Sequence, residues 1–177
     1  LVPEAKIIRH LSYEEANELA NFGASILHAK TIIPLIEKGI PLRIKNTFNS
    51  DDAGTLIHQE SVQEGIKSIS VIKDNALIVM EGRGLLGKVG VDARIFRALA
   101  QKGISVSIIS QGSSERGVGL VVASKDAKLA KAAIDEEFSH DFYTNDVSSV
   151  SIVDDVAVIS IVGQPLSTFH HPYNALI

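Results

Sequence analysis

A glycine-rich loop is the part of this sequence whose residue types could most directly bind a ligand. The loop reads GRGLLGKVG at residues 82–90, and its glycines have the spacing G-x-G-x-x-G of a dinucleotide-binding fingerprint. An apolar segment typical of a strand precedes it at residues 76–81, and an amphipathic segment typical of a helix follows it at residues 92–102. Main-chain amides at the start of such a helix can bind a phosphate or a small carboxylate.

Three interpretations of the glycine loop stay open at the level of sequence. In the first, a nucleotide-binding enzyme uses the loop from Gly82 to Gly87. Such a site also needs an acidic residue about 20 residues further on, whereas the next strand ends at Ser110 before a hairpin. In the second, the glycines only permit positive φ and close packing of the helix against the sheet. In the third, the amides of residues 85–91 bind the carboxylate of a small metabolite such as an amino acid.

The cysteine and histidine content argues against a thiol or metal site. The sequence has no cysteine, which excludes a disulfide, a thiolate nucleophile and a cysteine-based zinc site. His170 and His171 are adjacent, and neighbouring side chains of an extended segment point to opposite sides, which is unsuited to binding one metal ion. We therefore predict no metal site.

Composition and charge limit the classes of protein to which this chain can belong. Of its 177 residues, 45% are hydrophobic and 21% are charged, an ordinary balance for a globular protein. The formal net charge is -4, only 5% of residues are aromatic, and Lys and Arg form no run, so we expect no nucleic-acid partner. No apolar run approaches the roughly 18 residues of a membrane span. Because no signal-peptide pattern follows Leu1, we expect a soluble cytoplasmic segment of a longer chain, with no membrane partner.

The elements of the first third are predicted from caps and breakers. The segment beginning Ser12-Tyr13-Glu14-Glu15 has the S-x-x-E form of a capping box and should start a helix. Residues 12–38 then predict two or three short helices, and residues 42–48 predict a strand. Residues 58–66 have the composition of a linker, so we place a domain boundary near residue 62.

The remaining two thirds contain an internal repeat. The segments ISVIKDNALIVMEG and VSIVDDVAVISIVG end at residues 82 and 163 and align without a gap, so they are offset by 81 residues. A repeat of this length suits a duplicated α/β module. The first copy predicts strand, helix, strand, strand, helix over residues 76–138, to be completed by a further strand. This order is the ferredoxin-like α+β plan, a sheet with both helices on one face.

Two long segments together carry a resemblance to a known family. GRGLLGKVGVDARIFRALAQKGISVSIISQGSSERGVGLVV (82–122) resembles the first ACT module of the aspartate kinase family. LSYEEANELANFGASILHAKTIIPLIEKGIPLRIKNTFNSDDAGTLI (11–57) resembles the end of its kinase domain. The resemblance implies a kinase-domain remnant at residues 1–62, a first βαββαβ ACT domain at 63–145 and the start of a second at 146–177, with the tandem modules intertwined in this family.

The resemblance implies a regulatory segment that binds an end-product amino acid for feedback inhibition of an aspartate kinase. It also implies a homodimer through the ACT domains. The substrate-binding parts of the family are absent, so no catalytic residue is expected and no cofactor in this segment, although the intact kinase would use ATP and Mg. Fusion of the parent chain to homoserine dehydrogenase is left open. The main alternative from another class is a nucleotide-binding enzyme fragment that uses Gly82 to Gly87, and an ACT dimerisation module without a ligand is the third possibility.

The same resemblance implies an effector site in the first module. Gln111 matches the position whose amide recognises the effector in threonine-sensitive relatives. Ser105 and Ser107 fall where lysine-sensitive relatives surround lysine, and the acid that those relatives place at position 107 is missing, so threonine is favoured over lysine. Asp92 could meet the α-ammonium group of the ligand. The predicted effector-binding residues are Gly84, Leu85, Leu86, Gly87, Val91, Asp92, Ser105, Ser107 and Gln111.

Overall fold

The computed structural model describes residues 4–23, 26–60, 65–85, 88–111 and 117–164. Contacts between residues divide the chain into two compact units. The first unit comprises Leu1–Ile72 and Ile159–Ile177, and the second comprises Lys73–Val158. The predicted segment boundaries at residues 62 and 145 stay predictions.

The first unit contains two helices and a small sheet. Its helices are α1 (Tyr13–Asn21) and α2 (Ala29–Lys38), and its strands are β1 (His10–Ser12), β2 (Leu42–Ile44) and β3 (Thr55–His58). The sheet has the order β1-β3-β2, in which β3 runs parallel to β1 and antiparallel to β2. The predicted strand at residues 42–48 is too long. It ends at Ile44 because the Asn46 side chain accepts a hydrogen bond from the Phe48 amide at 3.0 Å and turns the chain.

The start of α1 confirms the predicted capping box. The Ser12 hydroxyl accepts from the Glu15 amide at 3.1 Å, and the Glu15 carboxylate accepts from the Ser12 amide at 2.8 Å. The Lys67 ammonium lies 2.7 Å from the same carboxylate, and both side chains are almost fully buried. One carboxylate therefore caps α1 and neutralises a lysine from the beginning of β4 (Gly65–Glu81).

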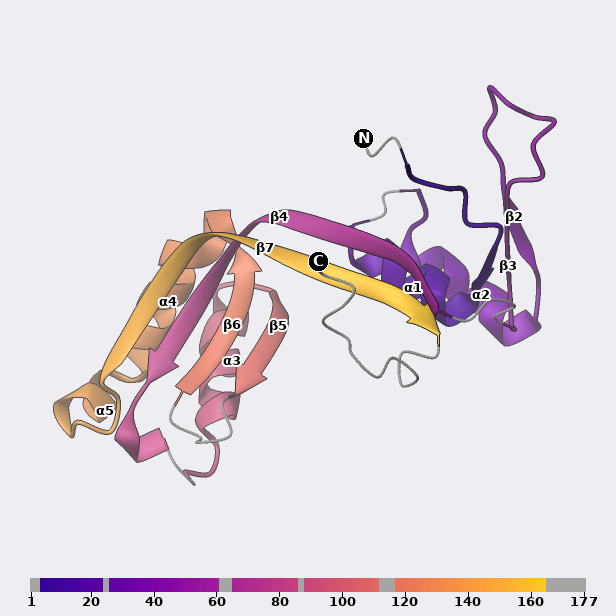
Figure 1. Ribbon diagram of the computed structural model, residues 1–177. Helices are drawn as coiled ribbons and strands as arrows, with labels where there is room; N and C mark the ends of the chain where they lie inside the picture. The colour runs from indigo at the N-terminus through magenta and orange to yellow at the C-terminus, as the bar shows by residue number, and fades with distance from the viewer. Residues whose placement is uncertain (1–3, 24–25, 61–64, 86–87, 112–116, 165–177) are drawn as a thin grey trace. The chain divides into compact units, whose positions relative to one another are not determined.

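The second unit has the predicted ferredoxin-like order. The elements after β4 are η1 (Arg83–Leu85), α3 (Val91–Gln101), β5 (Val106–Gln111), β6 (Gly117–Ala123), η2 (Ser124–Asp126), α4 (Ala127–Glu137), α5 (Ser139–Tyr143) and β7 (Ser149–Gln164). The sheet order is β5-β6-β4-β7, and β6 pairs antiparallel with both β4 and β5. Figure 1 shows α3 and α4 beside each other on one face of this sheet. The mixed α+β, ferredoxin-like prediction is confirmed.

The core of the second unit forms where the two helices meet the sheet. Alternate residues of β4 point inward, as expected for a strand with one covered face. Amphipathic periodicity supplies the facing side chains of the helices, and the fully buried set includes Ala76, Ile78, Met80, Ile95, Leu99, Leu120, Val122, Ala130, Ile134 and Phe138. This core fixes the start of α3, which carries the candidate site.

The repeated segments form the neighbouring strands β4 and β7. Asp74 and Asp155, at equivalent positions of the repeat, both have a left-handed backbone, with φ of 60° and 57°. Gly163, at the end of the second copy, lies so close to the main chain of Gly65 that a Cβ atom there would overlap it. The two copies therefore share an unusual local conformation as well as a sequence pattern.

Candidate functional site

A cavity of about 300 Å³ lies in the second unit, at the start of α3. Its walls come from the glycine loop, the first turn of α3 and the facing ends of β5 and β6. Gln111 pairs with Val118 in the antiparallel register of those strands, which brings both residues to the cavity. The lining residues are Leu85, Lys88, Val89, Gly90, Val91, Asp92, Gln111 and Val118.

Gly90 determines how the chain enters α3. It is the N-cap residue with φ of 88°, a left-handed conformation that side chains other than glycine rarely adopt. Its carbonyl accepts the first helical hydrogen bond, from the Arg94 amide at 3.1 Å. Among the described residues, no side chain caps this helix. The amides of its first turn can therefore donate to a ligand, at the positive end of the helix dipole.

Four of the nine predicted effector residues line the cavity, namely Leu85, Val91, Asp92 and Gln111. Leu86 and Gly87 lie outside the described residues. Gly84, Ser105 and Ser107 are not on the cavity lining. The Ser107 hydroxyl donates to the carbonyl oxygen of Val121 at 3.0 Å, so it is already paired within the sheet. The proposed ligand role of all nine remains a prediction.

Four lining residues are not among the nine predicted effector residues: Lys88, Val89, Gly90 and Val118. The first three lie within residues 85–91, whose amides the sequence proposed as a carboxylate site, and only Val118 was missed altogether. Lys88 and Gly90 belong to the glycine loop that the sequence singled out, and glycine directly before an amphipathic helix is a recognisable N-cap signal. Val118 could have been found only from the register of the β5–β6 hairpin.

Close packing against the chain itself explains the first two glycines of the loop. A Cβ atom on Gly82 would overlap the carbonyl oxygen of Asp146, and one on Gly84 would overlap the Asp146 side chain. The Gly84 amide donates to the Asp146 carbonyl at 3.0 Å. Neither glycine is among the residues with positive φ, so the expected need for positive φ does not apply to them. Their small size is required for close approach.

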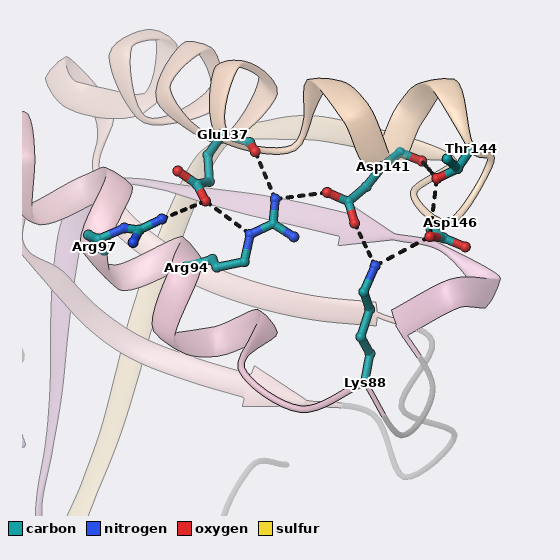
Figure 2. Close-up of polar contacts among 7 residues, drawn as sticks. All are labelled: Lys88, Arg94, Arg97, Glu137, Asp141, Thr144 and Asp146. Carbon is teal, nitrogen blue, oxygen red and sulfur yellow. Dashed lines mark hydrogen bonds and ion pairs between the residues drawn. The ribbon is translucent and has the colours of Figure 1, made fainter.

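A charged cluster, drawn in Figure 2, includes Lys88 from the cavity lining. Asp141 accepts from the Lys88 ammonium at 2.7 Å and from the Arg94 guanidinium at 2.8 Å. The hydrogen bond from Arg94, followed by that from Lys88, lowers the pKa of Asp141 to about 2, although burial acts in the opposite direction. The same contact raises the pKa of Lys88. Lys88 is therefore a cation at neutral pH and brings positive charge to the cavity wall.

The sheet order bears on the nucleotide interpretation. In a dinucleotide-binding fold, the strand that follows the glycine loop and helix runs parallel to the first strand and belongs to a parallel sheet. Here the neighbours of β4 among the described strands are β6 and β7, and the β4–β6 pair is antiparallel. The G-x-G-x-x-G spacing therefore does not lie in a Rossmann arrangement.

No helix among the described residues is long and apolar enough to cross a membrane. No group of three or more histidine, aspartate or glutamate side chains in these ranges is arranged to hold a metal ion. His170 and His171 lie outside the described part of the chain.

Comparison with known proteins first defines the class of the second unit. A family model described as an ACT domain matches residues 78–138, which contain the residues that line the cavity, the end of β4, and strands β5 and β6. A second model, described as the amino acid kinase family, matches residues 1–46 in the first unit. The chain therefore combines an ACT domain with part of an amino acid kinase region.

Similar proteins identify the family in which these two regions occur together. A protein of Haemophilus influenzae named bifunctional aspartokinase/homoserine dehydrogenase is 38% identical over 167 residues, which cover 92% of this chain and 20% of that protein. The solved aspartate kinase of Clostridium acetobutylicum is 29% identical with a TM-score of 0.79, covering 98% of this chain and 40% of that one. Aspartokinase III of E. coli, solved in complex with lysine and aspartate in the T-state, is 26% identical with a TM-score of 0.71, covering 92% and 35%.

This chain belongs to the aspartokinase family and corresponds to its regulatory part, where the end of the kinase region joins the ACT domain. It spans about one fifth of the length of the curated relative and about two fifths of the solved Clostridium enzyme.

Proposed function

We propose that this regulatory part of an aspartokinase binds an end-product amino acid in the cavity at the start of α3. The observation that supports the proposal is the set of groups around that cavity: the amides of the first turn of α3, the Asp92 carboxylate and the Gln111 amide. These groups match the three parts of an amino acid with a polar side chain. The amides suit its α-carboxylate, Asp92 its α-ammonium group and Gln111 its side chain.

Threonine is the favoured effector, with lysine as the alternative. The Gln111 amide can both donate to and accept from a hydroxyl group. A lysine effector carries a second ammonium group, which would need its own carboxylate partner in a partly desolvated site. Asp92 is the only acidic residue on the described cavity lining, and it is already assigned to the α-ammonium group, so the lining offers no further carboxylate for a second ammonium group. The charges of the cavity therefore favour a neutral side chain.

In the intact protein, the effector would regulate the phosphorylation of aspartate by ATP and Mg. A ligand can shift an equilibrium between an active and an inactive state only by its difference in affinity for the two states. A homodimer paired through ACT domains, in the cytoplasm, is the assembly we propose for transmitting that shift. This chain alone should show no ATP-dependent formation of aspartyl phosphate, and detection of that product would contradict its regulatory assignment.

Titration calorimetry with the purified chain tests the proposal. Threonine, lysine, methionine, ATP and NADPH are titrated separately under identical conditions. We expect heat of binding from threonine and none from ATP or NADPH. Heat from a nucleotide without heat from any amino acid would support a nucleotide site instead. The absence of heat from all five, with a stable dimer in solution, would support an ACT dimerisation module without a ligand.

A further inference from the structure

The segment that follows α4 lies directly against the glycine loop. Two main-chain hydrogen bonds join them: the Gly84 amide donates to the Asp146 carbonyl at 3.0 Å, and the Ser148 amide donates to the Glu81 carbonyl at 2.7 Å. Gly82 and Gly84 leave no room for a Cβ atom on this side. The beginning of the loop is therefore held by the turn at residues 144–148, which is far from it in sequence.

Asp141, in α5, holds the other end of the loop through its side chain. One carboxylate oxygen accepts from Lys88, two residues before the N-cap Gly90, and the other accepts from Arg94, four residues after it. A single carboxylate thus connects both sides of the helix start (Figure 2). The Asp141 side chain is 6% exposed, so water has little access to replace either partner.

The Asp141 carboxylate is itself held in place by its surroundings. Its main-chain carbonyl accepts from the amides of Asp146 and Val147 at 2.9 and 3.1 Å. On the other side, Arg94 donates to the Glu137 carboxylate at 2.9 Å and to the Glu137 carbonyl at 2.8 Å. The Arg94 guanidinium also lies 4.1 Å from the centre of the Phe138 ring. The position of Asp141 is therefore fixed by its neighbours, and its carboxylate in turn holds the more exposed Lys88 side chain.

We propose that Asp141 is a positioning residue for the effector cavity, holding the glycine loop and the start of α3 in the geometry that binds the ligand. The idea rests on the proposed function of that cavity. Asp141 is not on the cavity lining, so it acts through Lys88, which lines the cavity, and through Arg94 in α3. When Asp141 is changed, Arg94 keeps two bonds to Glu137, whereas Lys88 keeps only its contact with Asp146 at 3.3 Å, so the loss should fall mainly on Lys88 and the loop.

Hydrogen exchange of the loop amides gives a test that needs no ligand. In Asp141→Asn, the amides of residues 82–90 should exchange roughly tenfold faster, because the loop loses its charged hydrogen bond to the Asp141 carboxylate. Amides of β6 serve as the internal reference for the fold. Asp135→Asn is the matched control, since Asp135 pairs with Lys131 within α4 and is partly exposed.

Lys88→Met provides a second variant if Asp141→Asn does not fold, because the Lys88 side chain is 40% exposed and lies outside the core. It should speed exchange of the same loop amides. Combined with Asp141→Asn, it should add less than its effect alone, because the two changes share the contact between Lys88 and Asp141, while Lys88→Met also removes the longer contact to Asp146. Unchanged loop exchange in both variants would overturn the positioning role.

Threonine calorimetry on the same variants tests the positioning role of Asp141 separately from the proposed function of the cavity. We expect Asp141→Asn to weaken threonine binding roughly tenfold, and Asp135→Asn to leave it unchanged. If the wild-type chain binds no amino acid while loop exchange still responds, the proposed function fails and the positioning role stands. If threonine binds the wild type, Asp141→Asn and Asp135→Asn equally well, the positioning role fails and the proposed function stands.

Discussion

Two aspartates, one in each unit, show what burial does to an ion pair. Asp52 in the first unit is paired with Arg9, and Asp141 in the second is paired with Arg94 and Lys88. Hydrogen bonds lower the pKa of both carboxyl groups to about 2, from Arg9 and the Gly54 amide at Asp52, and from Arg94 and Lys88 at Asp141. The titration of the two groups is therefore alike.

Their surroundings differ. The side chains of Arg9 and Asp52 are 44% and 22% exposed, so water and salt can replace each partner when the pair is broken. Asp141 is almost fully buried, so water can hardly replace it when it is removed, although Lys88 then keeps Asp146 and Arg94 keeps Glu137. A lowered pKa alone does not reveal how much an ion pair contributes to stability, because the accessibility of the partners decides that.

The largest effect should come from Asp141→Ala. Breaking a buried ion pair on one side typically costs about 3–5 kcal/mol, and we expect a loss near the lower limit because Arg94 retains Glu137. Urea unfolding of the chain measures this loss. Asp52→Ala is the control and should change the free energy of unfolding little. Equal losses for the two variants would refute the comparison.

A substitution in the glycine loop can break its contact with residues 146–147, and we expect a smaller effect than that of Asp141→Ala. Gly82→Ala places a methyl group onto the Asp146 carbonyl, and such overpacking costs about 1–3 kcal/mol. The matched control is Gly117→Ala in β6, where a Cβ atom would lie 3.5 Å from the nearest atom, an ordinary contact. Thermal unfolding of the two variants should differ clearly. Similar midpoints would show that residues 146–147 can move away from the loop.

Acid should weaken both ion pairs, whereas high salt should weaken mainly the exposed pair of Arg9 and Asp52. Each folded-state pKa, about 2, lies below the ordinary aspartate value of 3.8, so each pair contributes stability that is present above pH 3.8 and is lost as the pH falls towards 2. Asp141→Asn should therefore flatten the acid branch of the stability profile. Asp52→Asn should flatten it less, and not at all at high salt, because the exposed pair is screened. Urea titrations between pH 5 and pH 2, at low and high salt, would check this order; identical profiles would contradict it.

The smallest effect on stability should come from Gln111→Ala, which tests the cavity itself. Gln111 is exposed at the end of β5, so truncation should leave the unfolding midpoint nearly unchanged. If its amide recognises a threonine hydroxyl, the loss of that bond costs about 1–3 kcal/mol, or roughly 5- to 150-fold in affinity. Calorimetry and thermal unfolding on one preparation measure both quantities. Unchanged threonine affinity would place the effector elsewhere, and an unstable apo variant would make Gln111 a structural residue.

Local patterns in the sequence predicted most of the second unit. The helix predicted at residues 92–102 corresponds to Val91–Gln101, and the strand predicted at residues 76–81 is the end of β4, Gly65–Glu81. These elements follow from side-chain periodicity and from glycines at their ends, which act over a few residues. The capping box of α1 is of the same kind, since Ser12 and Glu15 are three residues apart.

The support behind the cavity could not be predicted in the same way. The contact between Lys88 and Asp141 joins residues 53 positions apart. A single sequence offers no local signal for such a pair, because it depends on how α5 packs after the sheet has formed. For the same reason, the close approach of residues 146–147 to Gly82 was not foreseen. The glycines were interpreted through ligand binding, positive φ, or packing of the following helix against the sheet.

The repeated strands have a consequence that concerns symmetry. Gly82 lies against Asp146 at one end of the β4–β7 pair, and Gly163 lies against Gly65 at the other. Residues 65 and 82 of the first copy are equivalent to residues 146 and 163 of the second, so the two contacts are the same contact made twice. This reciprocity is the rule for an isologous interface between identical subunits. The β4–β7 pair therefore has local pseudo-twofold symmetry, in which each copy of the repeat makes the same contact with the other copy.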